Sequence, residues 1–191
     1  MRITAHSTLE QVAAVLAGVL REAGIKAVLT GGACATIYSA GGHQSEDLDL
    51  ILQSSPTQRS LDEAMAKAGF VRNGDFYEHP RTSFFVEFPR GPLAIGTDTS
   101  IAPVEVQVEG VPVLLLSAED SCRDRLAAFD HWKDRQALGA AVAIATNHPL
   151  DLEKTRAWSR REGAAAGFVE FQRTLEAAKA ASHRSRPRGP R

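Results

Sequence analysis

Apolar residues near the start of the chain recur at helical spacing and then form a short continuous run. From Thr8 to Ala23, leucine, valine and alanine return every three or four residues, which predicts an amphipathic helix. Ser7 is placed to cap the start of this helix, and Gly24 stands where it would end. The run K-A-V-L-T at 26–30 then predicts a short buried strand.

Acidic and apolar residues alternate strictly at positions 47–52, which read D-L-D-L-I-L. Successive side chains of a strand point to opposite faces, so Asp47 and Asp49 share one face and the leucines between and after them share the other. A rise of roughly 3.3 Å per residue places the two carboxylates about 6–7 Å apart along the strand. The pattern predicts a strand with one acidic face and one apolar face.

Later segments show either the helical spacing of three to four residues or the two-residue alternation of a strand, and glycine, proline and asparagine separate them. Pro89–Pro103 is irregular and predicts either a lid or a long surface loop. The other predicted elements are a helix at Gln58–Ala68, a hairpin at 70–78 turning at Asn73-Gly74-Asp75, strands at Ser83–Phe88, Val104–Val108 and Val111–Leu116, helices at Ala118–Ala128 and His131–Thr146, and a last helical region that begins after Asp151 and is broken at Gly163 and Gly167.

This order of elements predicts an α/β fold, in which helices flank a small mixed sheet and a C-terminal helical part follows. We expect the α/β domain to occupy residues 1–116 and the helical part, packed on it, residues 117–181. Residues 182–191 are basic and rich in proline and serine, which predicts a disordered tail. Such a tail is either simply solvated or able to touch RNA or another polyanion.

Composition narrows the class of protein without naming a function. The 191 residues are 43% hydrophobic and 24% charged, and their formal net charge is −1, so no bulk basicity indicates nucleic-acid binding. The two cysteines have no metal-ligand or disulfide spacing and predict buried, reduced thiols in a cytoplasmic protein. No signal peptide and no run of about 18 apolar residues is visible, so we expect no membrane span.

The acidic face of the predicted strand is a candidate metal site. Asp47 and Asp49 could converge on one divalent ion or on two ions about 3.5–4 Å apart. Magnesium commonly binds one or two protein carboxylates and completes its shell with substrate phosphate oxygens. The alternative is an edge strand whose acidic face is simply in water.

Two glycines precede this strand in a context that favours anion binding. Gly31-Gly32 directly follows the strand at 26–30, and residues 33–38 can begin a helix that ends at Gly41-Gly42. A strand, a glycine turn and a helix N-terminus together present free N–H groups and a positive dipole end. Gly-Gly alone is equally consistent with a simple turn. A phosphate-binding turn followed by two metal-ligand carboxylates is a far less common combination.

The order of these residues resembles a known signature. Gly31-Gly32, a short helix and then Ser45-x-Asp47-Leu48-Asp49-Leu50 is similar to hG[GS], about a dozen residues, and Dh[DE]h, where h is apolar. This is the signature of the polymerase-beta-like nucleotidyltransferase superfamily. Many members carry arginine or threonine shortly before the aspartates. This chain has His43-Gln44-Ser45-Glu46 there, of which only Ser45 matches well.

Glu87 is a candidate third carboxylate. It stands among apolar residues on a predicted central strand, where an unpaired carboxylate is costly to bury, so it should be paired, protonated or bound to a cation. The resemblance implies that it completes the metal site and acts as general base. The alternatives are a glutamate facing solvent or one paired with Arg90 or Arg81.

Two basic positions in the predicted C-terminal helices also match the family pattern. The resemblance implies that Arg125 and Lys133, followed by Asp134, line the nucleotide side and contact the triphosphate. The alternative is a charged helix face with pairs at i,i+4 spacing.

The resemblance implies a magnesium-dependent nucleotidyltransferase, with manganese as a possible substitute ion. Asp47, Asp49 and Glu87 would hold the metal, and Gly31, Gly32, Ser45, Arg125 and Lys133 would hold the triphosphate. The enzyme would transfer a nucleoside monophosphate from an NTP to an acceptor hydroxyl and release pyrophosphate. Related acceptors include tRNA, proteins and small molecules, and several small bacterial members are toxins or antitoxins, which makes a cognate toxin or antitoxin a candidate partner. The alternative is a catalytically inactive nucleotide-binding or antitoxin-like interaction protein.

Overall fold

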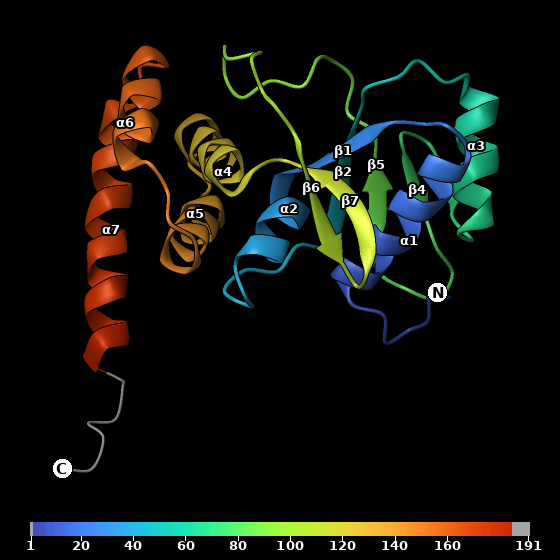
Figure 1. Cartoon of the computed structure of the whole chain (residues 1–191), viewed down its shortest axis with the longest axis horizontal. Helices are drawn as coiled ribbons and strands as arrows, with labels where there is room; N and C mark the ends of the chain where they lie inside the picture. Colours follow the sequence, from blue (N-terminus) through green and yellow to red (C-terminus); the bar gives the residue numbers. More distant parts are fainter. Residues whose placement is uncertain (1, 185–191) are drawn as a thin grey trace.

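A computed structural model describes residues 2–184 as a mixed sheet joined to a stack of helices (Figure 1). The α/β architecture expected from the sequence is confirmed. The elements are α1 (Leu9–Glu22), β1 (Ala27–Thr30), α2 (Gly31–Tyr38), β2 (Asp47–Leu52), α3 (Gln58–Lys67), β3 (Val71–Asn73), β4 (Phe76–Glu78), β5 (Phe85–Glu87), β6 (Val104–Val108), β7 (Val111–Leu115), α4 (Ala118–Trp132), α5 (Arg135–Asn147), α6 (Leu152–Arg161) and α7 (Ala165–Arg184).

The acidic strand β2 lies in the middle of the sheet. The seven strands run in the order β3-β4-β5-β2-β1-β7-β6. β2 pairs antiparallel with β1 and parallel with β5, whereas β1 pairs parallel with β7. Because a central strand is hydrogen-bonded on both edges, the direction of its side chains is fixed by two neighbours.

The apolar face of β2 belongs to the hydrophobic core beneath α1. Leu48 is fully buried and Leu50 is 6% exposed, and both border the same space as Leu16 and Leu20 of α1. α1 begins with a capping box in which Thr8 Oγ1 accepts from Gln11 N and Gln11 Oε1 accepts from Thr8 N. The cap is therefore Thr8 and not Ser7, whose hydroxyl instead accepts from Thr4 N.

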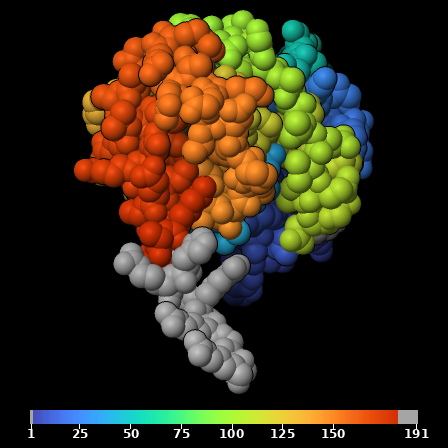
Figure 2. Space-filling model, turned by 60° about the vertical axis from the view of Figure 1, so that its left-hand side comes forward, coloured from blue at the N-terminus to red at the C-terminus, as the bar shows by residue number. Residues whose placement is uncertain are grey.

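The C-terminal helices are anchored on α2, which is almost entirely buried. α4 and α5 pack against each other and against α2, and α6 and α7 form the outer layer (Figures 1 and 2). His148 Nε2 forms a hydrogen bond with Tyr38 O at 2.9 Å, and Asn147 Nδ2 donates to Ser39 O at 3.1 Å. These bonds tie the helical part to the end of the helix that follows the two glycines.

Three boundaries in the helical part differ from expectation. α4 continues to Trp132, and Lys133 ends it in the left-handed conformation, so no helix begins at His131. Gly163, with φ +74°, separates α6 from α7, but Gly167 lies inside α7 and does not break it. α7 continues to Arg184, three residues into the predicted tail, and 185–191 lie outside the described residues.

The segment 89–103 has no helix and no paired strand apart from one bridge between Ile95 and Asp98, in line with its irregular sequence. It is nevertheless tied to the helical part at two points. Thr97 donates from both its backbone N–H and its hydroxyl to the Glu162 carboxylate, and Arg123 donates to Asp98 at 2.9 Å. The segment therefore spans from the end of β5 to α4 and the end of α6.

No helix within residues 2–184 combines the length and the apolar character needed to cross a membrane.

Candidate active site

Three carboxylates lie on one face of the sheet. In the parallel pair of β2 and β5, Asp49 lies directly beside Glu87 and Asp47 lies beside Phe85. Neighbouring residues in register project to the same face, so Asp47, Asp49 and Glu87 share the face opposite Leu48. All three are half-buried. The acidic strand predicted from the sequence thus faces another acidic residue and not bulk water alone.

The electrostatics of this face are unfavourable without a cation. Burial, followed by the negative charges of Asp47 and Glu87, raises the pKa of Asp49 to about 6, against the opposing effect of Arg125. A carboxylate in such surroundings binds protons or metal ions more readily than one in water. The cluster therefore has the charge pattern of a site that receives positive charge.

The two glycines allow the acidic strand to approach the start of α2. β1 ends at Thr30, which pairs with Asp49, and α2 begins at Gly31 with φ +65°. A Cβ on Gly31 would overlap the Asp49 carboxylate, and one on Gly32 would lie 2.5 Å from Ser45 Oγ. Gly31 therefore has a backbone conformation and surroundings that require glycine, whereas a side chain at Gly32 would displace that of Ser45.

The start of α2 remains open to a ligand. Its N-cap residue, Thr30, makes no side-chain capping hydrogen bond. The first N–H groups of a helix have no partner within the helix, and they carry its positive dipole end. These groups lie beside the carboxylate face, as a metal–phosphate site requires.

The loop before β2 contributes Ser45 and His43. The Ser45 hydroxyl donates to Asp47 Oδ1, and Ser45 N donates to Thr36 Oγ1, which itself donates to Gly32 O. His43 Nε2 lies 3.4 Å from the position of a Cβ on Gly32 and is buried without a hydrogen-bond partner among the described residues. Burial, followed by Arg125, lowers the pKa of His43, which favours a neutral imidazole.

Sequence reasoning treated His43 only as a departure from the family pattern, yet the structure places its side chain beside Gly32. Its position is set by the path of the loop between α2 and β2, where Ser39 Oγ accepts from His43 N at 3.1 Å. In the sequence, only Ser39, four residues before His43, could have indicated this loop path, and a single serine is a weak signal.

Arg125 reaches this site from α4, as the family pattern suggested. Its Nε and Nη2 donate to Asp124 Oδ2 at 3.1 and 2.7 Å, and its side chain is only 16% exposed. With Asp49, Gly31 and Thr30, the pair lines a cavity of about 220 Å³. Asp124 is a site residue that sequence reasoning missed.

Lys133 is not brought to the carboxylates. It is exposed, and its left-handed conformation, φ +55°, ends α4. Asp134 is used as the N-cap of α5, where it accepts from Gln136 N and Ala137 N. Within residues 2–184 Lys133 forms no ion pair with Asp47, Asp49 or Glu87, so its placement does not match the one that the resemblance implied.

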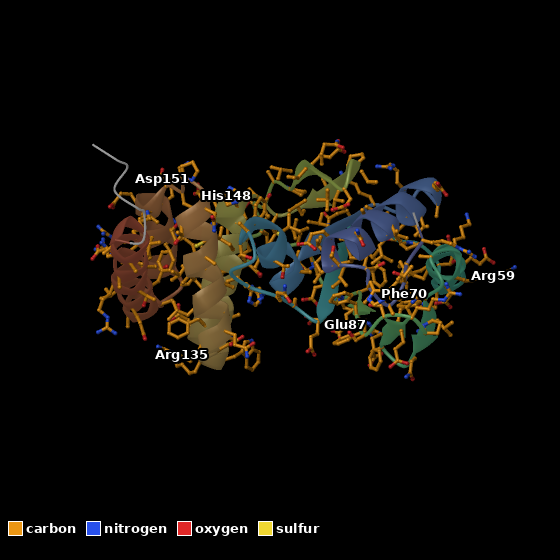
Figure 3. All side chains as sticks on the ribbon, turned by 90° about the horizontal axis from the view of Figure 1, so that it is seen from below. Arg59, Phe70, Glu87, Arg135, His148 and Asp151 are labelled. Atoms are coloured by element: carbon orange, nitrogen blue, oxygen red, sulfur yellow. The ribbon has the colours of Figure 1, made fainter. Side chains whose placement is uncertain are left out.

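Glu87 is not held by an arginine. The ion pairs formed within residues 2–184 include none to Glu87, so neither Arg81 nor Arg90 neutralises it. Figure 3 shows Glu87 in the sheet half of the molecule, whereas Arg135 lies in the helical half. The carboxylate is therefore available to a ligand.

The donor set suits magnesium better than a metal held by protein alone. In the part of the chain that the structure describes, no three histidine, cysteine, aspartate or glutamate side chains are arranged to hold a metal ion by themselves. Magnesium usually takes one or two carboxylates and completes its shell with water and substrate phosphates. Asp47 and Asp49 beside an uncapped helix start fit that mode of binding.

A larger cavity, of about 420 Å³, lies on the opposite face between α1 and the sheet. Apolar side chains such as Leu16, Leu29 and Leu48 dominate its lining. Catalysis needs ionisable or metal-binding groups, and these gather on the other face. Size alone therefore does not identify the site here.

Known proteins resemble this chain in fold and not in sequence. No model of a protein family matches it, and no curated protein is significantly similar in sequence. An antigenic nucleotidyltransferase-like protein from Paracoccidioides brasiliensis aligns with a TM-score of 0.56 and 19% identity, over 88% of this chain and 94% of that one. The antibiotic-resistance factor ANT(2'')-Ia aligns with a TM-score of 0.53 and 15% identity, over 90% of this chain and 97% of that one.

The fold is thus nucleotidyltransferase-like over nearly the whole chain. The sequence signature and these structural neighbours lead to the same class of fold.

Proposed function

We propose that the protein is a metal-dependent nucleotidyltransferase that transfers a nucleoside monophosphate from an NTP to an acceptor hydroxyl. The observation that carries the proposal is the pairing of Asp49 with Glu87 next to the uncapped glycine start of α2. Nucleotidyl transfer needs carboxylates for metal ions and N–H groups for phosphates within one site.

The residues of the site have distinct roles in this proposal. Asp47 and Asp49 hold magnesium, which when bound supplies positive charge to the phosphate oxygens. The N–H groups of Gly31 and Gly32 bind the triphosphate, and Ser45 orients Asp47 through its hydroxyl. Arg125 adds a positive charge on the α4 side of the cavity.

Glu87 is placed to accept the proton of the acceptor hydroxyl. The acceptor oxygen then forms a bond to the α-phosphorus, the bond from this phosphorus to the β-phosphate bridging oxygen breaks, and pyrophosphate leaves. Glu87 suits this role because no cation pairs with it within residues 2–184, and because it lies beside Asp49 in register. Its proton-accepting role is a proposal carried over from the resemblance.

The test is transfer of label from NTP. The full-length protein is incubated with magnesium and each NTP labelled at the α-phosphate, with a cell extract separated afterwards into RNA, protein and small-molecule fractions. We expect label in one fraction with wild type and none with Asp49→Asn. Binding of NTP without transfer to any fraction would favour the alternative, a nucleotide-binding protein without turnover. Absence of both binding and transfer would contradict the proposal.

A further inference from the structure

A second cavity adjoins the candidate active site along α4. It has a volume of about 350 Å³ and shares Asp124 and Arg125 with the cavity that contains Asp49. It extends along α4 as far as Trp132, seven residues or two helical turns beyond Arg125, which is about 10 Å along the axis. The two cavities thus form a route from the carboxylates to the end of α4.

Trp132 is exposed in a way that the fold does not explain. Its side chain is 78% exposed, more than any other large hydrophobic residue within 2–184. The left-handed Lys133 ends α4 directly after it, and His131 packs edge-on against the indole with ring centroids 5.5 Å apart. A large aromatic surface beside a cavity is typical of a ligand platform.

Carboxylates and the Arg125 guanidinium line this cavity. Asp130 and Glu162 only accept hydrogen bonds, and Glu162 already accepts from Thr97. Asp130 Oδ2 and the Nε1–H of Trp158, a side chain that is 1% exposed, are buried without partners among the described residues. A planar ligand with N–H donors on its edge suits a wall of indole and carboxylate.

We propose that this cavity binds the nucleobase of the NTP, stacked on Trp132, and favours bases with an exocyclic amino group. The inference rests on the proposed function, because the triphosphate is assigned to Gly31, Gly32 and Arg125. Arg125 borders both cavities and so lies between phosphates and base. Stacking on an aromatic side chain accepts every base, and the carboxylates then disfavour uracil, which has no amino group.

Fluorescence can test this directly, because the chain has two tryptophans and only Trp132 is exposed. A non-hydrolysable ATP analogue with magnesium is titrated against wild type and Trp132→Phe, and inorganic triphosphate serves as the ligand without a base. We expect the ATP analogue to quench wild-type emission and to change that of Trp132→Phe far less, with only a small change from triphosphate.

Affinity measured by calorimetry gives a second readout. Trp132→Ala should weaken binding of the ATP analogue about tenfold and leave that of inorganic triphosphate unchanged. Val169→Ala, at a residue 66% exposed on α7, should change neither, and a UTP analogue should bind wild type several-fold more weakly than the ATP analogue.

Three results would overturn the inference. Equal affinity of wild type and Trp132→Ala for the ATP analogue would show that Trp132 does not contact the base. Quenching by spermidine but not by the ATP analogue would assign the cavity to an amine-bearing acceptor and leave the proposed function intact. Binding of neither the ATP analogue nor triphosphate to wild type would reject the proposed function and this inference together.

Discussion

The two faces of β2 have opposite effects on the stability of the protein. On one face, Leu48 is fully buried and Leu50 is 6% exposed beneath α1. On the other face, Asp47 and Asp49 lie beside Glu87, and burial with the like charges raises the pKa of Asp49 to about 6. The apolar face stabilises the fold, whereas the acidic face opposes it when ionised.

This difference indicates that the leucines of β2 serve folding and its aspartates serve chemistry. A sheet with alternating leucine and a neutral polar residue would fold at least as well, because it would avoid three neighbouring negative charges. Strain or repulsion that local packing does not require is typical of a functional site. The acidic face of β2 should therefore be dispensable for folding and essential for activity.

The largest expected effect is on the acidic face. Asp49→Asn should reduce nucleotidyl transfer by about a thousandfold or more, since it removes a metal-binding charge without changing the size of the side chain. Initial rates with labelled NTP measure the effect. Asp75→Asn, at an exposed aspartate in the β3–β4 turn, is the matched control and should retain wild-type activity. Activity of Asp49→Asn within tenfold of wild type would remove the acidic face from the mechanism.

Substitutions on the apolar face of β2 should lower the stability of the protein. Leu48→Ala leaves a cavity in the core below α1 and should lower the free energy of unfolding by about 3 kcal/mol. Urea unfolding followed by circular dichroism measures this change. Val71→Ala, at a residue that is 68% exposed, should change it by less than about 0.5 kcal/mol. A Leu48→Ala protein as stable as wild type would mean that this face is not the packed core described above.

Two arginines on α4 provide the next contrast. Arg123 is held by Asp98 and Asp120, whereas Arg125 pairs with Asp124 and lines the cavity beside Asp49. Arg125→Gln should reduce transfer about a hundredfold and lower the unfolding midpoint only modestly, because it leaves one carboxylate, Asp124, unpaired. Arg123→Gln should lower the midpoint more and transfer far less, because it leaves two half-buried carboxylates unpaired away from the cavity beside Asp49. Equal effects of both changes on activity would argue against a specific role for Arg125.

The smallest effect is a pH dependence of stability. Folding raises the pKa of Asp49 from its ordinary 3.8 to about 6, so its ionised form destabilises the folded state above pH 6 and has little effect near pH 4. In EDTA, Asp49→Asn should therefore be roughly 2 kcal/mol more stable than wild type at pH 8, and the gain should shrink as the pH falls from 6 to 4. Denaturation at pH 8 and pH 4 measures it. A gain of the same size at both values would contradict the assignment.

Much of the fold could be predicted because its signals are local. β2 at Asp47–Leu52 and β6 at Val104–Val108 have the predicted bounds, since period-two alternation sets both ends of a strand. The break between α4 and α5 was expected before His131 and lies after Trp132, because an asparagine or glycine usually marks a left-handed residue and here the residue is Lys133.

The site was only partly predictable. Asp47 and Asp49 are two residues apart in sequence, so their common face followed from strand geometry alone. The pairing of Asp49 with Glu87 depends on strand order and register, which a resemblance can suggest but spacing cannot derive. His43 and Asp124 reach the site through a loop path and a helix orientation, and Trp132 through the point where α4 ends.

The most direct test of the central claim is the magnesium dependence of NTP binding, measured by calorimetry with a non-hydrolysable NTP analogue. The structure predicts that wild type binds the analogue with magnesium and much more weakly in EDTA, and that Asp49→Asn binds weakly in both conditions. Binding of equal strength with and without magnesium, or unchanged by Asp49→Asn, would contradict the account.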